Sequence, residues 1–481
     1  MHSLDNAVTK QHARKAASRG IGPTNPAKAS SFFDRLFLVS TLDLQAFELI
    51  RRKYTDSKVV FWDSRETNER SLMETAAMAR RTIVEDTIAE TACAIIGHDA
   101  ALLSEWDPSI AACLATSTED NDNEIAPPYV TGDKPVLFCP LNETHVQTLA
   151  PISRLFAESR FLSSGGPHAK GAEEMMQSLN LEYCVGPAAE IARIKPSVLV
   201  LAKDWCLHAQ RLIAAARKEG IPVVCLQEGP TRFDCDQRMQ RCDYPLIQGA
   251  VMLRFLHQKV YFLTGNARFD GLKPAPLPAA PKAMLNCNFG KDSFERHRWL
   301  DAAASACLDA GVDFFVSRHP RDSGDIPDYP TRCSGPGVIH THLADSSVVV
   351  TPHSSIIYEA MLMGRTVICH DPRQDRIQAF DEDQTGAFVK SQSTADLLDA
   401  LKQALCPPSE QQRSRADLFL ALHCGGREGK AADRCASAIE AISRRARPVT
   451  KRAFSWSFVG RPFAKGIAAL RKAGNRITTT S

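Results

Sequence analysis

The stretch SVLVLAKDWCLHAQRLIAAARKEGIPVVCLQEG, residues 197–229, decides the fold class. It begins with a short apolar run, continues with apolar residues at helical spacing, and ends in a second apolar run. Gly220 and the Ile-Pro that follows it mark the end of the helix before the next strand. Strand, helix and strand in this order form the βαβ unit of a parallel sheet.

The same alternation extends in both directions from this stretch. Further apolar runs before residue 272 lie at 36–43, 58–63, 135–142 and 260–266, and those after residue 281 lie at 282–290, 312–320, 346–352 and 365–371. Between the two series, LKPAPLPAAP holds four prolines in ten residues, which excludes helix and central strand. The sequence therefore predicts an α/β protein with two Rossmann-like open parallel-sheet domains joined by a semi-rigid linker.

We expect five segments along the chain. They are a disordered leader (1–30), an N-terminal domain (31–271), the Pro-rich linker (272–281), a C-terminal domain (282–443) and a basic tail (444–481). The leader is polar and lacks apolar periodicity, which indicates disorder, although its scarcity of acidic residues also suits a transit peptide.

The composition is that of a soluble globular protein, with 44% hydrophobic and 23% charged residues in 481. Its 15 cysteines are scattered without a CxxC pair, which favours reduced thiols in the cytoplasm over a disulfide framework. No apolar run approaches the ~18 residues that span a bilayer. We therefore expect a cytoplasmic protein.

The tail concentrates the positive charge, because residues 444–476 hold ten basic residues and no acidic one. Its interleaved aromatic residues suit an anionic membrane surface, which would place the protein on the inner face of a membrane. Packing against the N-terminal domain is the alternative. Nucleic-acid contact is a third interpretation, and we do not expect it.

Three loops that follow apolar runs carry the candidate site residues. In the first, Gln227-Glu228-Gly229, the Glu228 carboxylate suits a general base and the glycine permits close approach of a ligand. In the second, Arg318-His319-Pro320-Arg321, an imidazole between two guanidiniums suits a phosphate. An exposed turn is the alternative reading of either loop.

The third loop is Ser354-Ser355, which opens a helix-like run containing Glu359. Unpaired amides and hydroxyls at a helix start attract an anion, whereas the simple alternative is N-capping. Glu359 lies four residues after Ser355, so it is not in a capping box but on the same helix face, where it could accept hydrogen bonds from a ribose diol. Together these features predict a nucleotide site.

Metal binding is not expected. Asp234-Cys235-Asp236 imitates a DxD metal motif without supporting context, and His340-Thr341-His342 lacks a third ligand nearby. The stretch CGGREGKA (424–431) resembles a phosphate loop but lacks its first glycine and the hydroxyl residue after the lysine.

In their order and spacing, the three loops resemble the bacterial sialyltransferases and polysialyltransferases of the GT-B fold. YFLTGNARFD (261–270) and GREGKAADRCASAIE (426–440) are similar to capsule Kdo transferases and CDP-glycerol transferases. The resemblance covers about residues 221–440. It implies a GT-B fold with two domains facing a cleft, acceptor on the N-terminal domain and nucleotide-sugar donor, CMP- or CDP-linked, on the C-terminal one.

The resemblance also implies roles for individual residues. Glu228 would deprotonate the acceptor hydroxyl, His319 would stabilise the leaving phosphate, Ser354 and Ser355 would bind that phosphate, and Glu359 would bind the ribose. The flanking Arg318 and Arg321 would add charge to the donor site. The family has an acidic pair where this chain has Gln227-Glu228, so its first acid is missing.

The predicted function is a metal-independent glycosyltransferase of surface or capsular polysaccharide synthesis, with no cofactor besides its donor. The partners would be the nucleotide sugar and a glycan or lipid-linked acceptor. Two alternatives remain: a nonhydrolysing nucleotide-sugar 2-epimerase, whose usual glycines and second Glu this chain lacks, and a catalytically degenerate carbohydrate-binding module.

Overall fold

A computed structural model gives the structure of the chain. It describes the backbone of 35–39, 57–62 and 92–96, residue 129, and residues 131–445 except 231–238, 250, 253–259, 288–292, 320–321, 323, 336, 353, 373–379, 381–382 and 384. The predictions for the leader and for the tail beyond residue 445 lie outside these residues.

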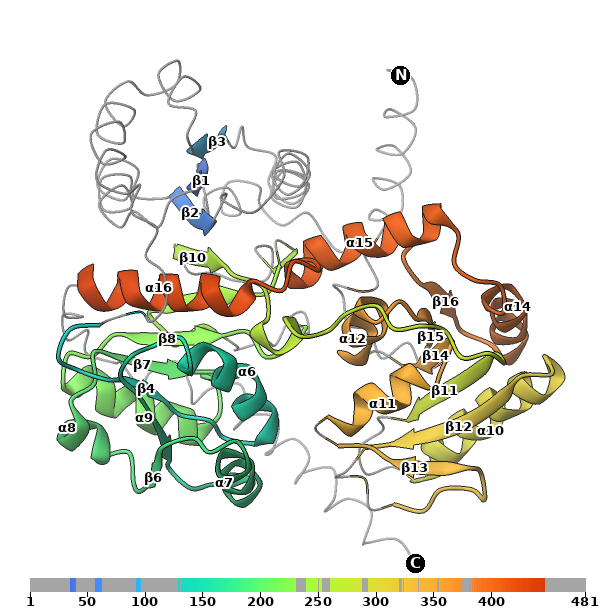
Figure 1. Cartoon of the computed structure of the whole chain (residues 1–481), viewed down its shortest axis with the longest axis horizontal. Coiled ribbons are helices and arrows are strands. Elements are labelled where there is room, and N and C mark those ends of the chain that lie inside the picture. The colour runs from blue at the N-terminus through green and yellow to red at the C-terminus, as the bar shows by residue number, and fades with distance from the viewer. Residues whose placement is uncertain are drawn as a thin grey trace, which may run out of the picture.

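The first domain is built on a ten-stranded sheet in which neighbouring strands run parallel. Its order is β3-β1-β2-β10-β9-β8-β7-β4-β5-β6 (Figure 1). The strands are β1 (Arg35–Val39), β2 (Ser57–Trp62), β3 (Ala92–Ile96), β4 (Val136–Phe138), β5 (Ser159–Ser163), β6 (Tyr183–Val185), β7 (Val198–Leu201), β8 (Val223–Leu226), β9 (Tyr244–Ile247) and β10 (Val260–Leu263).

Helices cover both faces of this sheet. They are α6 (Glu143–Ser153), α7 (Ala169–Ser178), α8 (Glu190–Ile194) and α9 (Leu207–Lys218), with the short 3-10 helix η3 (Ala267–Phe269) before the linker. Alternate residues of β7 enter opposite cores: Val198 and Val200 pack with α6 and α7, whereas Leu199 and Leu201 pack with α8 and α9. A strand buried on both faces needs apolar residues throughout, which is why this run is uninterrupted.

The second domain has a six-stranded parallel sheet of order β13-β12-β11-β14-β15-β16. The strands are β11 (Lys282–Cys287), β12 (Asp313–Arg318), β13 (Thr331–Cys333), β14 (Val348–Thr351), β15 (Thr366–His370) and β16 (Val389–Ser391). One face is covered by α10 (Ser293–Asp309) and α14 (Thr394–Ala404), the other by α11 (Val338–Ala344), α12 (Ile356–Leu362) and α15 (Glu410–Cys424). The predicted fold class, two Rossmann-like open parallel sheets in a GT-B-like pair, is confirmed.

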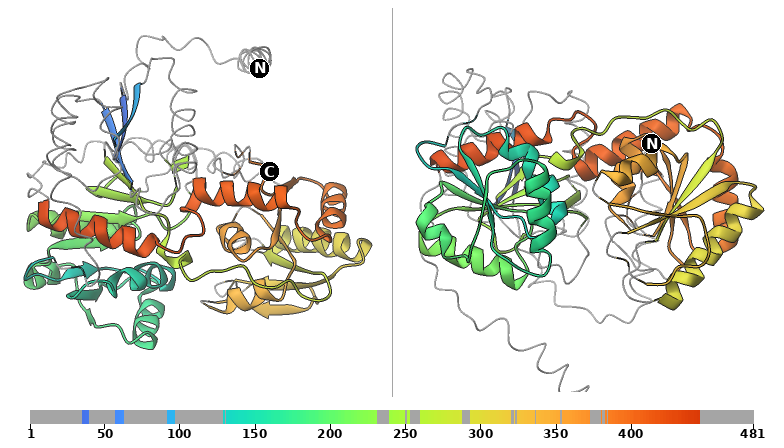
Figure 2. Two further views of the ribbon diagram at one scale, coloured as in Figure 1. Left: turned by 45° about the horizontal axis from the view of Figure 1, so that its top comes forward. Right: turned by 60° about the horizontal axis from the view of Figure 1, so that its bottom comes forward.

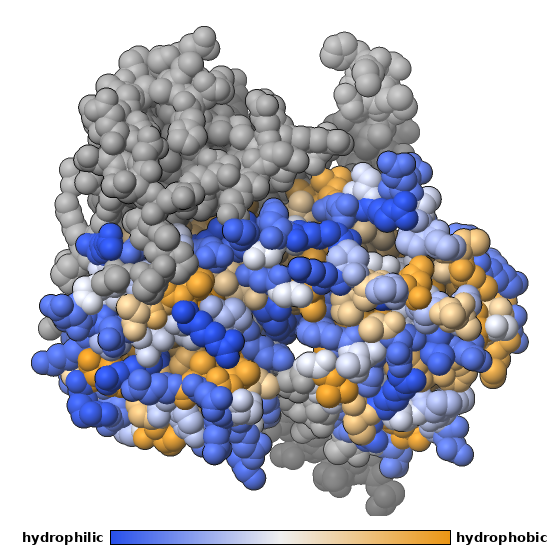
Figure 3. Space-filling model, viewed as in Figure 1, coloured by the Kyte–Doolittle hydropathy of each residue, from blue (hydrophilic) through white to orange (hydrophobic). Residues whose placement is uncertain are grey.

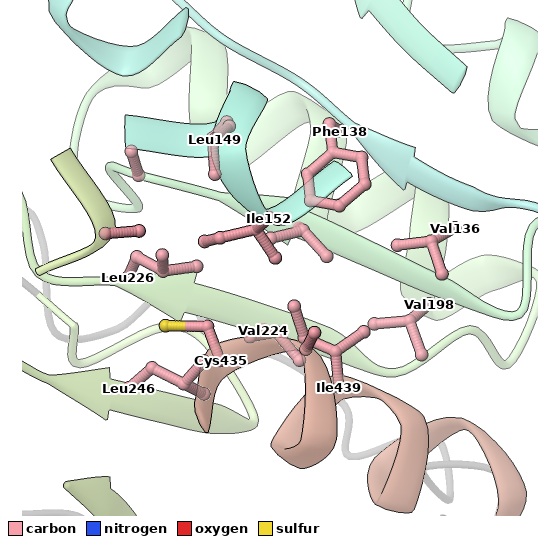
Figure 4. Close-up of a cluster of buried hydrophobic side chains, with 14 of the residues drawn as sticks. Val136, Phe138, Leu149, Ile152, Val198, Val224, Leu226, Leu246, Cys435 and Ile439 are labelled. Atoms are coloured by element: carbon pink, nitrogen blue, oxygen red, sulfur yellow. The ribbon is translucent and has the colours of Figure 1, made fainter. Parts of the chain in front are cut away.

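The last described helix, α16 (Ala431–Arg445), crosses back to the first domain (Figures 1 and 2). Its Cys435 and Ile439 pack into the same core as Val136, Phe138 and Val198 (Figure 4). The predicted C-terminal domain extends to residue 443 and so includes most of this helix. The structure places this apolar helix face on the first sheet instead, because that sheet would otherwise leave its core open there.

The Pro-rich segment 272–281 runs along the second domain. The Ala275 N–H donates to the carbonyl of Met363, and the buried Arg365 guanidinium donates to the carbonyls of Ala275 and Pro276. Burial lowers the pKa of Arg365. A segment that cannot form strand or helix is thus held through its carbonyls, which proline retains.

The returning chain passes the outgoing chain at close range. A Cβ on Gly425 would lie 2.7 Å from the Gly265 Cα, and Gly425 has a φ of +87°. Asp270 accepts hydrogen bonds from the N–H groups of Ala431 and Ala432, at 3.0 and 2.7 Å, and so caps α16 from the other chain segment. The glycines of 424–431 therefore allow the two chain segments to pass at this short distance.

The space-filling view, seen as in Figure 1, shows a hollow between the two domains, below α15 and α16 (Figure 3). Among the described residues, no helix is both long and apolar enough to cross a membrane.

Candidate functional site

The predicted loops follow the carboxyl ends of parallel strands. Glu228 follows β8, His319 follows β12, and Ser354 with Ser355 follows β14. Arg268 of η3, which follows β10, approaches Glu359 of α12, so the two domains come close to each other at this contact. Ligands of open α/β sheets bind outside the carboxyl ends of the strands.

Glu228 lies against a buried histidine. The Glu228 Oε2 is 3.2 Å from Nε2 of His145, whose side chain is fully buried while that of Glu228 is 35% exposed. His145 is in the first turn of α6, where its N–H donates to the capping side chain of Asn142. The Leu141 N–H donates to His145 Nδ1 at 3.2 Å, so in the neutral imidazole the proton lies on Nε2, the nitrogen nearer the carboxylate. The two groups are close but not aligned for a hydrogen bond.

Gln227, the residue in place of the missing first acid, is buried and fixes the loop. Its amide N–H donates to the carbonyl of Gly229 at 2.9 Å, and its amide oxygen accepts from the Gln248 N–H at 2.9 Å. The Gln248 side chain donates to the Gln227 carbonyl at 2.7 Å. A carboxylate could accept from Gln248 but could not donate to Gly229, which gives a physical reason for an amide here.

The loop after β12 is held by two arginines. Arg318 donates to the carbonyls of Asp322 (2.8 Å) and Gly324 (2.5 Å), so two of its nitrogens already have protein partners. The buried Arg296 of α10 donates to Asp322 Oδ1 at 2.6 Å and to the Asp325 carbonyl at 3.1 Å. His319 sits within this braced turn, with its carbonyl accepting from the Asp322 N–H.

The Ser354-Ser355 turn does not cap α12 in the usual way. Ser355 occupies the N-cap position without a side-chain capping hydrogen bond, and the Ser354 hydroxyl accepts only a long 3.4 Å bond from the Ile356 N–H. The next two amides, of Ile357 and Tyr358, donate to the carbonyls of Ser354 and Ser355. These two amides are therefore occupied, and the serine hydroxyls are donors that this turn can offer.

Glu359 is buried and lies between two basic side chains. Its Oε1 is 3.4 Å from Nε2 of His340, and its Oε2 is 3.8 Å from Nη2 of Arg268. Burial opposes the charge of the carboxylate, but Arg268 and the hydrogen bond from His340 outweigh it and lower the pKa of Glu359. Glu359 is thus ionised near neutral pH and held by two long contacts.

The strand register places the His319 and Ser354 loops at the same edge. β11 lies between β12 and β14, pairing Cys287 with Arg318 and Leu285 with Val350. Two strand spacings of ~4.8 Å separate the loops.

Arg321 lies outside the described residues, as does the DxD-like sequence at 234–236. His340 and His342 serve different partners, since His342 Nδ1 lies 2.9 Å from the Ser317 hydroxyl.

The roles of two residues in this region, His145 and Arg268, were not predicted from the sequence. His145 could have been found from its place three residues after Asn142, a capping residue that follows the apolar run 135–142. Arg268 lies inside the quoted stretch 261–270, but nothing in the sequence indicates that it reaches Glu359 in the other domain.

No protein-family model matches the chain, and no curated protein matches it. Among solved structures, it is similar to the UDP-GlcNAc 2-epimerase of Neisseria meningitidis bound to UDP-GlcNAc, with 11% identity, 63% of this chain and 99% of that one covered, and a TM-score of 0.46. It is also similar to the spinosyn forosaminyltransferase SpnP (14% identity, 65% and 98% covered, TM-score 0.45). A third is the wall teichoic acid polymerase TagF (13%, 79% and 99%, TM-score 0.43). At these values the likenesses carry no argument about activity.

Proposed function

We propose that the protein is a glycosyltransferase that transfers a sugar from a nucleotide-activated donor to a surface glycan or lipid-linked acceptor. The observation that carries this proposal is the approach of Arg268, from the first domain, to Glu359, from the second. The first domain presents a part-exposed carboxylate backed by a buried imidazole, and the second presents hydroxyl and basic groups. Such an arrangement suits a reaction between an alcohol and a phosphate-activated sugar.

The donor would bind to the second domain. The hydroxyls of Ser354 and Ser355 would donate to its phosphate, and Glu359 would accept from its ribose hydroxyls, displacing the long contact to His340. His319 would donate to the leaving phosphate oxygen, with Arg318 and Arg321 adding positive charge. CMP and CDP are the nucleotides suggested by the resemblance of the motifs.

The acceptor would bind to the first domain beside Glu228. In the reaction, Glu228 takes the proton of the acceptor hydroxyl, the oxygen forms a bond to the anomeric carbon, and the bond from that carbon to the phosphate oxygen breaks. His145 would orient the carboxylate, because its tautomer is fixed by the Leu141 N–H. The donor charge would be met by protein groups, so we propose a metal-independent reaction, for which EDTA should leave the rate unchanged.

The basic tail would hold the enzyme at an anionic membrane, near a lipid-linked acceptor. Co-sedimentation of the full chain and of a variant lacking residues 446–481 with anionic and neutral vesicles tests this. Binding of both forms to anionic vesicles would reject the anchor.

A thermal-shift screen with CMP, CDP, UDP and GDP tests the proposed function, because a ligand at ~100 times its dissociation constant adds ~2.7 kcal/mol of stability. The sugar conjugate of the best nucleotide is then incubated with acceptor glycans, and free nucleotide is measured. Glu228→Gln should slow its release by about 10²–10⁴-fold. Formation of an epimeric nucleotide sugar without acceptor would instead identify a 2-epimerase, and no shift with any nucleotide would favour a degenerate binding module.

A further inference from the structure

Arg268 is a largely buried cation at the junction of the two domains. It lies in η3, immediately before the linker, and its side chain is only 12% exposed. The Asn266 side chain accepts from the Arg268 N–H and fixes the turn, and the Phe269 ring lies under the guanidinium, 4.9 Å from its carbon. The backbone and the ring thus set the direction of the side chain.

The guanidinium has unfilled donors. Its Nε and Nη2 are buried and have no hydrogen-bond partner, and Glu359 Oε2, at 3.8 Å from Nη2, is beyond hydrogen-bonding distance. Buried donors without acceptors cost about 1–3 kcal/mol each, more when charged, so native proteins rarely leave them open. The described residues therefore supply no hydrogen-bond acceptor for these two nitrogens of Arg268.

Other arginines at the same crossing are satisfied by the protein. Arg427 donates to the carbonyls of Met361 and Leu362 and to Asp417, and Arg434 donates to the carbonyl of Thr264 and to Glu428. These two have clear structural roles in joining the segments. Arg365 also has two buried nitrogens without a partner, but its Nη2 donates to two carbonyls. Arg268 is different, since its guanidinium meets one carboxylate at long range and has no side-chain hydrogen bond to the described residues.

We propose that Arg268 binds the phosphate of the nucleotide donor, reaching it from the first domain. An oxyanion matches the planar fork of a guanidinium, and Glu359 holds that fork in place without saturating it. Ser355 lies one helical turn, ~5.4 Å, before Glu359 on the same helix face, so the serine hydroxyl and the guanidinium flank one stretch of surface. This inference rests on the proposed function and completes its donor site with a residue from the other domain.

Inorganic pyrophosphate tests the idea without requiring the right base. Calorimetric titration of the full chain should give binding that Arg268→Gln weakens at least tenfold and Arg268→Lys weakens less. The same ratio should appear with CDP, or with whichever nucleoside diphosphate gives the largest thermal shift, but not with the matching nucleoside. Glu359→Gln should weaken the nucleoside, because this carboxylate is the proposed acceptor for the ribose hydroxyls.

Arg332→Gln is the matched control, because Arg332 is a half-exposed arginine of the second domain paired with Asp345, and it should leave both affinities unchanged. Circular dichroism establishes that each variant is folded. If Arg268→Gln does not fold, Arg268→Lys is compared with the wild type instead. Equal pyrophosphate affinity in wild type and folded Arg268 variants overturns the inference while leaving the proposed function intact. Pyrophosphate binding that depends on Arg268, without binding of any nucleotide, overturns the proposed function and leaves Arg268 as an oxyanion-binding residue for another ligand. Binding of neither ligand overturns both.

Discussion

The Glu228 carboxylate lies 3.2 Å from the fully buried imidazole of His145, whose other nitrogen accepts the Leu141 N–H. Glu228 follows β8 and His145 lies in α6, so residues 83 positions apart in the sequence meet beside one sheet. A rigid partner on the buried side limits the directions that the carboxylate can take.

Removing the His145 imidazole should therefore slow turnover without weakening donor binding. We expect His145→Phe to lower kcat about tenfold to a hundredfold, since misplacing a reacting group by ~1 Å can cost that much. His145→Gln, which can still offer an N–H, should recover part of the loss. Steady-state kinetics and donor titration of both variants check this, and a reduced donor affinity with unchanged kcat would contradict it.

Restoring the acidic pair should harm this protein. In Gln227→Glu, a carboxylate would face the Gly229 carbonyl, to which the amide now donates. We expect a loss of about 1–3 kcal/mol in the free energy of unfolding, measured by urea denaturation. Turnover should fall as well, because the loop that carries Glu228 loses the hydrogen bond from the residue 227 side chain to the Gly229 carbonyl. An equally stable and faster variant would show that the amide has no special function.

The braced loop around His319 should respond to a single methyl group. A Cβ at Gly324 would collide with Nη2 of Arg296, the arginine that binds Asp322. Gly324→Ala should cost about 1–3 kcal/mol of stability and lower kcat. Gly335→Ala is the control, since no atom lies within 4 Å of its added Cβ. Similar behaviour of the two variants in thermal unfolding would count against the brace.

Glu359 should stabilise the fold above the pH at which it takes up a proton. Because its pKa in the folded state is lowered from 4.5, its contribution is complete above pH 4.5 and is lost as the pH falls through the lower folded value. Glu359→Gln should be less stable than wild type at pH 7, by about 1.5–3 kcal/mol, and the difference should shrink below pH 4.5. Urea titrations at pH 7 and 3.5 measure it, and a difference that does not change with pH would exclude an ionised Glu359.

His423 should make the second domain sensitive to acid. Burial lowers the pKa of His423 to about 3, and its ring stacks on Phe419 at 4.0 Å. Below pH 6.5 the unfolded chain takes up a proton that the folded chain does not, so stability falls by about 1.4 kcal/mol per pH unit. His423→Phe should remove this component of the slope between pH 6.5 and 4.5, as seen in unfolding titrations. Parallel slopes would show that the imidazole is protonated in the folded state.

Part of the site could be predicted from the sequence because it depends on local order. A loop after an apolar strand of a parallel sheet emerges at the ligand-binding edge, so Glu228, His319, Ser354 and Ser355 could be assigned to that edge before their surroundings were known. Their roles stay predictions. Short strands with weak apolar patterns, such as β5 and β9, were not foreseen, since their pairing rather than their own residues defines them.

The sequence by itself determined the two parallel sheets and the extended linker, because hydrophobic periodicity and proline geometry act over a few residues. The tertiary structure decided which distant side chains meet: His145 with Glu228, Arg268 with Glu359, and α16 with the first sheet. It also showed that Arg318 braces its own loop. Such pairings depend on packing between elements far apart in the chain, and no local pattern of residues encodes them.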